Sequence, residues 1–217
     1  MESYPVPLRE TRIEMRVVNS RFIATVAPVF SVDEAKAFIG RVREEFADAS
    51  HNVPAYIIGH GATVTAHCSD GGEPSGTAGR PALAVLRGSG LGDAAVVVTR
   101  YFGGTKLGTG GLVRAYGDAV REVLAALPRA ERVPTHVVLI AVPYSLYELV
   151  RLAIESHRGV LLDAEFAADV TITATFPVGR IDDFQSALNE LSRGTLQGEI
   201  VDTRDAIVPL LPDGARE

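Results

Sequence analysis

Residues 69–119 contain two glycine-rich turns with basic side chains beside them, a combination that suits the binding of an anion. An apolar run at 94–99 and a helical apolar pattern from 112 onward would place the intervening glycine-rich loop between a strand and a helix. Glycine lets backbone amides approach a ligand closely, and a helix start adds free N–H groups and a positive dipole end. The residues that we expect to hold the anion are Arg100, Gly103, Gly104, Lys106, Gly110, Gly111 and Arg114.

The charge distribution favours the same hypothesis. From Gly71 to Arg121 the chain has six Lys or Arg against three acids, while its net charge is −6, so the remaining residues carry −9. A locally positive element in an acidic protein favours one focused anion site. The acidic balance argues against broad binding along nucleic acid, which needs many neutralised phosphates.

Two other interpretations of this segment remain open. The glycines can simply shape tight turns, and the loop fits neither a Walker A motif nor the dinucleotide fingerprint G-x-G-x-x-G. Charged residues near turns are often merely paired. In that case Arg100 and Arg114 would lock the turns through ion pairs with a nearby acid, for which the candidates are Asp70, Glu73 and Asp118.

Polar residues around the glycine-rich segment are candidates for supporting a ligand or contacting a partner. Asp70 and Glu73 suggest paired carboxylates, but acid–base catalysis needs one raised pKa, so we favour a structural role and assign no catalytic residue. Ser75 and Thr77 are more typical of turn caps than of nucleophiles. The supporting set is His51, Asp70, Glu73, Ser75, Thr77 and Tyr101.

Two aromatic residues, Tyr101 and Phe102, directly follow Arg100. Neighbours in a strand face opposite sides, so one ring can pack inside while the other stays exposed. An exposed ring beside an arginine can stack on a nucleobase. The alternative, which we favour, is that both rings are partly buried under the glycine-rich loop.

The remaining composition predicts a cytoplasmic protein without a metal or cofactor. None of the five histidines belongs to a metal-binding motif. The single cysteine, Cys68, excludes an internal disulfide and fits a reducing compartment. The N-terminus has no secretory pattern, and no apolar run reaches membrane-spanning length.

Hydrophobic periodicity predicts two α+β domains, residues 1–130 and 131–217, joined by a linker at 128–134. After a flexible lead-in at 1–10, the first domain has strands at 13–18, 21–27, 53–58, 63–67 and 94–99. Its helices begin near Ser31, at 81 and near 112. The second domain has the order βαββαβ, a ferredoxin-like arrangement, with helices starting at Ser145 and Ile181 and a tail from 209. Gly159 is predicted to cap the first of these two helices.

Several runs of this sequence resemble the IMPACT/YigZ family and cover about the first 130 residues. They are SRFIATVA (20–27), the pair His51-Asn52, SDGGEPSGTAG (69–79), TRYFGG (99–104) and LGTGGLVRAY (107–116). Two positions depart from the family pattern. Gly71 stands where a second acid is expected, and Val53-Pro54 stands where a cysteine and an aromatic residue are expected.

The resemblance implies a fold for each domain and a role in the regulation of translation. The first domain should be similar to the second domain of ribosomal protein five of the small subunit, and the second to domain five of elongation factor G. Eukaryotic relatives restrain the amino-acid-starvation kinase pathway by competing for its ribosome-associated activator. We therefore expect a translation-linked regulator whose partner is the ribosome, RNA or a translation-associated protein. The alternatives are an enzyme acting on a phosphorylated small molecule at the loop, and a pure protein-interaction module.

Overall fold

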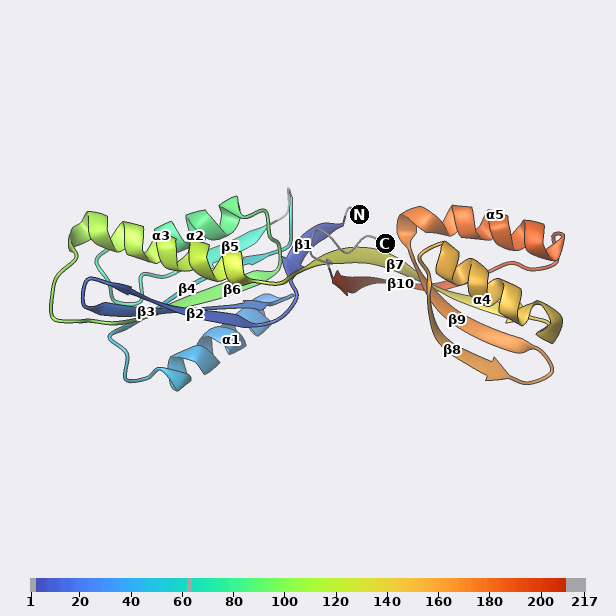
Figure 1. Cartoon of the computed structure of the whole chain (residues 1–217), viewed down its shortest axis with the longest axis horizontal. Helices are drawn as coiled ribbons and strands as arrows, with labels where there is room; N and C mark the ends of the chain where they lie inside the picture. The colour runs from blue at the N-terminus through green and yellow to red at the C-terminus, as the bar shows by residue number, and fades with distance from the viewer. Residues whose placement is uncertain (1–2, 62–63, 210–217) are drawn as a thin grey trace. The chain divides into compact units, whose positions relative to one another are not determined.

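The computed structural model describes residues 3–61 and 64–209, which form a larger unit of residues 4–131 and a smaller unit of residues 132–207 (Figure 1). Both units combine helices with an antiparallel sheet, which confirms the α+β class. Each unit encloses apolar cores of its own residues.

The larger unit is built on a sheet of strands in the order β2-β3-β6-β4-β5, with every neighbouring pair antiparallel. The central strand β6 is buried along nearly its whole length because helices cover both faces of the sheet. The strands span Thr11–Val17 (β2), Ser20–Pro28 (β3), His51–Ile58 (β4), Thr65–Cys68 (β5) and Ala94–Tyr101 (β6).

Three helices complete this unit as two outer layers. Helix α1 (Val32–Glu45) packs on one face of the sheet, and α2 (Gly79–Gly88) and α3 (Gly108–Ala126) pack on the other (Figure 1). Successive side chains of β6 alternate between the two cores, so that Val98 lies with α2 and α3 while Val97 lies with α1. The same alternation sends Arg100 toward the α3 side.

The predicted start of α1 is confirmed in its details. Ser31 is the N-cap, and its side chain accepts a hydrogen bond from the Glu34 amide. The Glu34 carboxylate in turn accepts from the amide of Phe30 at 2.9 Å. Reciprocal capping of this kind satisfies amides that the helix itself leaves free.

Two segments predicted to be irregular are strands. The lead-in contains β1 (Tyr4–Pro7), and the predicted linker lies largely within β7 (Arg129–Val142), with which β1 pairs. Proline removes a donor but keeps its carbonyl, and the Pro5 carbonyl accepts from the Gly92 amide at 2.9 Å. The prediction that these two segments are irregular was wrong.

The smaller unit has the predicted βαββαβ order. Its sheet runs β8-β9-β7 with β10 on β7, the ferredoxin-like arrangement. Helices α4 and α5 bury Val150, Ile154, Phe184 and Leu188 in the core of this unit. Besides β7, the elements span Tyr147–Ser156 (α4), Val160–Phe166 (β8), Val170–Pro177 (β9), Ile181–Ser192 (α5) and Glu199–Pro209 (β10). The predicted strand residue 63 and the tail from 210 lie outside the described residues.

Of the two helix caps expected in this unit, the one at the start of α4 is wrong and the one at its end is confirmed. A short 3-10 turn at Tyr144–Leu146 precedes α4, which begins without a side-chain cap, so Ser145 does not cap it. At the other end, Arg158 takes the left-handed conformation, with φ 60°, and the Gly159 amide donates to the Ile154 carbonyl at 2.8 Å, so Gly159 takes part in the cap as expected. Gly159 is also needed for space, because a Cβ there would lie 2.4 Å from the Phe176 ring.

The two units of the chain lead to a prediction about folding. We expect a fragment of residues 1–131 to unfold cooperatively in urea without the rest of the chain, because its cores use only its own residues. The measurement is circular dichroism across a urea series, with the full chain as reference. A fragment without a cooperative transition would contradict the proposed domain boundary near residue 130.

Candidate functional site: a cavity beside a buried ion pair

A buried ion pair joins the end of β6 to the loop before α2. Arg100 Nη1 lies 2.7 Å from Glu73 Oε1, and the two side chains are only 5% and 3% exposed. The Tyr116 hydroxyl, from α3, donates to the same carboxylate oxygen at 2.7 Å. Burial and this hydrogen bond raise the pKa of Tyr116 well above its ordinary value, so the phenol stays a donor.

Arg100 keeps one donor without a partner. Its Nη2 donates to Ser20 Oγ at 3.2 Å, and the same hydroxyl accepts from the Gly103 amide at 3.3 Å. Its Nε is buried and has no hydrogen-bond partner. Buried N–H groups are rarely left unpaired, so this one is unusual.

His51 approaches the ion pair from β4. Its Nε2 lies 3.8 Å from Glu73 Oε2, while its Nδ1 lies 3.1 Å from the carbonyl oxygen of Gly71. A carbonyl can only accept, so this contact is a hydrogen bond when Nδ1 carries the proton. In the neutral ring, Nε2 is then the free acceptor on the side of the carboxylate.

These groups border a cavity of about 380 Å³ at the N-terminus of α3. Helix α3 starts after Leu107 without a side-chain cap, so no side chain takes its first amides. Lys106 is exposed, and the apolar wall includes Phe102, which is 46% exposed. The lining residues are His51, Glu73, Pro74, Arg100, Phe102, Lys106, Leu107, Gly108, Thr109 and Leu112.

This cavity differs from others in its charged floor. Cavities of about 410 and 440 Å³ lie elsewhere, but their linings include no buried charged side chain. Glu73 neutralises Arg100, which leaves Lys106 and the α3 N-terminus as positive elements at the mouth. The arrangement suits a small anionic group.

Asp70 organises the loop and does not line the cavity. Its carboxylate accepts from the backbone amides of Gly76, Ala78 and Gly79 at 2.9, 3.1 and 2.9 Å. Burial by itself would raise the pKa of Asp70, but these three hydrogen bonds outweigh it and hold the pKa below its ordinary value. Because α2 has no side-chain cap at Ala78, Asp70 caps that helix from a distance. Asp70 and Glu73 therefore have different partners, and Asp70 has a structural role in the loop.

Glycines near the cavity have identifiable structural roles. Gly103 passes so close to the turn between β2 and β3 that a Cβ would lie 1.9 Å from the Asn19 carbonyl oxygen. Gly71 has φ 58°, and its Cβ would lie 2.4 Å from the Asn52 carbonyl oxygen. With this backbone no side chain fits at Gly71, the position where the family pattern suggests an acid.

The structure brings together four of the residues expected from the sequence: His51, Glu73, Arg100 and Lys106 line one cavity. Of the two arginines, Arg100 is paired with Glu73, as one alternative interpretation expected, whereas Arg114 is exposed on α3. Ser75 is exposed, and Thr77 donates to the Pro74 carbonyl, so both belong to the turn. The expected residues that do not line the cavity are Asp70, Ser75, Thr77, Tyr101, Gly103, Gly104, Gly110, Gly111 and Arg114.

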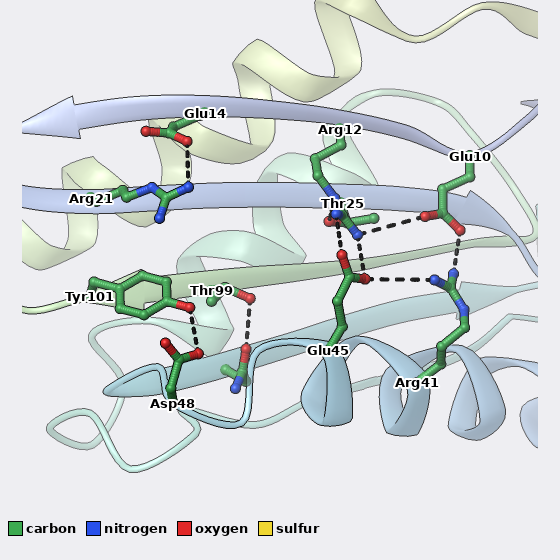
Figure 2. A network of polar contacts seen from close by, with 11 residues as sticks. Glu10, Arg12, Glu14, Arg21, Thr25, Arg41, Glu45, Asp48, Thr99 and Tyr101 are labelled. Carbon is green, nitrogen blue, oxygen red and sulfur yellow. Dashed lines mark hydrogen bonds and ion pairs between the residues drawn. The ribbon is translucent and has the colours of Figure 1, made fainter.

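The two aromatic residues separate as neighbours in a strand should. Tyr101 donates to Asp48 on the α1 side of the sheet (Figure 2), while Phe102 lines the cavity. The favoured expectation that both rings are partly buried under the loop was wrong, because Phe102 is exposed. Figure 2 also shows the ion pair of Arg21 with Glu14, which joins two exposed side chains and contributes little to stability.

The sequence interpretation missed Tyr116 and Ser20 as parts of the site. Tyr116 was assigned only to the buried stripe of α3, but a buried tyrosine hydroxyl needs a partner, and that rule was the available signal. Ser20 opens a buried strand, and only the tertiary contact with Arg100 reveals its role.

Comparison with known proteins identifies the family of both units. Residues 18–124 match the Impact N-terminal domain, and residues 140–195 match a domain of unknown function, DUF1949. The chain is 36% identical to the Escherichia coli (strain K12) protein named IMPACT family member YigZ, over 91% of this chain and 97% of that protein. The chain belongs to the IMPACT family.

Two further matches support the assignment to the IMPACT family. IMPACT family member YvyE of Bacillus subtilis (strain 168) is 34% identical over 83% of each chain. A solved structure titled "Crystal structure of an hypothetical protein" is 35% identical, with a TM-score of 0.63, and covers 93% of this IMPACT chain and 98% of that one. Among residues 3–61 and 64–209, no cluster of three metal-ligating side chains is found, and no helix is long and apolar enough to cross a membrane.

Proposed function

We propose that this IMPACT-family chain is a cytoplasmic, translation-linked regulator that binds RNA at the cavity beside α3. The observation that carries the proposal is the exposed ring of Phe102, which lies next to Lys106 at the mouth of a cavity with a buried arginine. Aromatic rings beside cations bind single-stranded RNA by stacking and charge attraction.

The position of Phe102 supports a stacking role. The Arg100 guanidinium lies 5.5 Å from the centroid of the Phe102 ring and also 5.5 Å from that of Phe22. Contact with a buried, ion-paired side chain helps to hold the Phe102 ring in place. A ring held in advance loses less conformational entropy when a base stacks on it.

Variants at the mouth of the cavity test this function. We expect Phe102→Ala to weaken binding of a single-stranded RNA by about 5- to 150-fold, the effect of ~1–3 kcal/mol of stacking. Lys106→Ala should weaken binding and make it less salt-dependent, by about one phosphate contact. Fluorescence anisotropy of a labelled oligonucleotide across a salt series measures both.

The matched controls are Phe30→Ala and Lys36→Ala, which remove exposed residues of the same types at and near the start of α1. They should bind as the unchanged protein does. Equal losses in the test and control variants would contradict a specific site. RNA binding that survives both test variants unchanged would place the interface elsewhere.

A second candidate function has one observation in its favour. His51 has one ring nitrogen against a backbone carbonyl and the other facing a buried carboxylate in a cavity, which is how a proton-transferring histidine is held. This geometry supports an enzyme that acts on a phosphorylated small molecule. Thermal-shift screening with nucleotides and sugar phosphates separates the two: strong stabilisation by one of them, without RNA binding, would favour the enzyme.

A further inference from the structure

We propose that the cavity takes a terminal phosphate monoester, so that the chain recognises a phosphorylated end of RNA and not the middle of a strand. This inference rests on the proposed RNA-binding function and specifies the group bound. Its basis is the set of unused donors around one cavity, the balance of charge there and the acidic character of the whole chain.

The cavity gathers donors that nothing in the described part of the chain satisfies. Arg100 lines it and has a buried Nε without a partner. The first turn of α3 has no side-chain cap, and Gly108 and Thr109 from that turn also line the cavity. A monoester presents three unesterified oxygens, whereas an internal diester presents two, so the monoester can use more of these donors.

The local charge matches a monoester better than a diester. Glu73 cancels Arg100, so the remaining positive charge is Lys106 and the helix N-terminus, together about +1.5. A phosphate monoester carries about −1.5 to −2 near neutral pH, while a diester carries about −1.

The net charge of the whole chain and the burial of the innermost cavity residues argue against a strand that passes through the cavity. The chain has a net charge of −6, which repels an extended phosphate backbone. The groups on the cavity floor, Glu73 and Arg100, are almost completely buried, so a ligand that reaches them enters by its end. Gly110 and Gly111 add no side chains to the first turn of α3, and a Cβ at Gly110 would meet nothing within 4 Å.

The experiment compares four oligoribonucleotides of one sequence. The first three have a 5′-phosphate, a 3′-phosphate, or hydroxyl groups at both ends, and the fourth is hydroxyl-ended and one nucleotide longer as a control for charge. We expect one phosphorylated form to bind about tenfold more tightly than both hydroxyl forms, the scale of a charge-assisted hydrogen bond. Tighter binding of the 5′-phosphate form would identify the ligand as a 5′ end of RNA, and tighter binding of the 3′-phosphate form as a 3′ end.

Variants assign that preference to the cavity. Lys106→Ala should abolish the preference, Lys106→Arg should keep most of it, and Arg114→Ala should leave it unchanged because Arg114 does not line the cavity. Equal binding of all four oligonucleotides, with sensitivity to Phe102→Ala, would overturn the terminal-phosphate proposal and leave the RNA-binding function standing. Failure to bind any of them would overturn both. A preference that Lys106→Ala leaves intact would also overturn the assignment to this cavity.

Discussion

Glu73→Ala should lower the free energy of unfolding of the larger unit by about 3–5 kcal/mol, among the largest effects we expect from any single substitution here. The change removes the partner of a buried guanidinium and leaves Arg100 charged, 5% exposed and without its ion pair. It also removes the acceptor of the buried Tyr116 hydroxyl. Uncompensated burial of a charge costs far more than loss of an exposed ion pair.

Urea denaturation followed by circular dichroism measures this change in stability. The control is Asp118→Ala, which breaks an exposed ion pair with Arg121 on α3 and should cost only about 0.5 kcal/mol. The double variant Glu73→Leu with Arg100→Met should recover much of the lost stability, because apolar residues of similar size can replace a buried pair. A Glu73→Ala protein as stable as the Asp118→Ala control would show that the pair is not buried in solution.

Asp70→Ala should destabilise the same unit by about 2–4 kcal/mol, because one carboxylate satisfies three backbone amides and caps α2. Asp70→Asn keeps the shape but loses the charge and should have a smaller effect. Neither substitution removes a residue that lines the cavity. The free energy of RNA binding, measured on the folded fraction, should therefore change less than the free energy of unfolding.

The pH dependence of stability gives a separate test of Asp70. The pKa of Asp70 is below its ordinary value in the folded protein, so its contribution is fully present above the unfolded pKa of about 3.9. That contribution is lost as the pH falls through the folded pKa. The stability difference between the unchanged protein and Asp70→Asn, measured in urea at pH 7 and near pH 3, should shrink at the lower pH. A constant difference would show that the carboxylate is not the group that holds the loop.

Local sequence patterns were sufficient for most of the secondary structure. The capping residues Ser31 and Glu34 predicted the start of α1, and apolar periodicity predicted most strands of both sheets and the long helix α3. Such patterns can be recognised because positions two residues apart in a strand, or three to four apart in a helix, lie on the same face and share one environment. The motifs of residues 69–116 also identified the family, which the comparisons confirm.

Only the tertiary structure decided which charges meet. Asp70 and Glu73 are three residues apart, yet one holds backbone amides and the other forms a buried pair with Arg100, 27 positions away in the chain. Arg100 and Arg114 looked equivalent in the sequence, but one points into the core and the other lies exposed on α3. The physical reason is that periodicity records whether a position is buried, whereas pairing depends on how distant strands and helices are brought into register. The same reason applies to the proline-containing segments that form β1 and the first part of β7. Each is a strand because it pairs with a partner strand that no local pattern reveals.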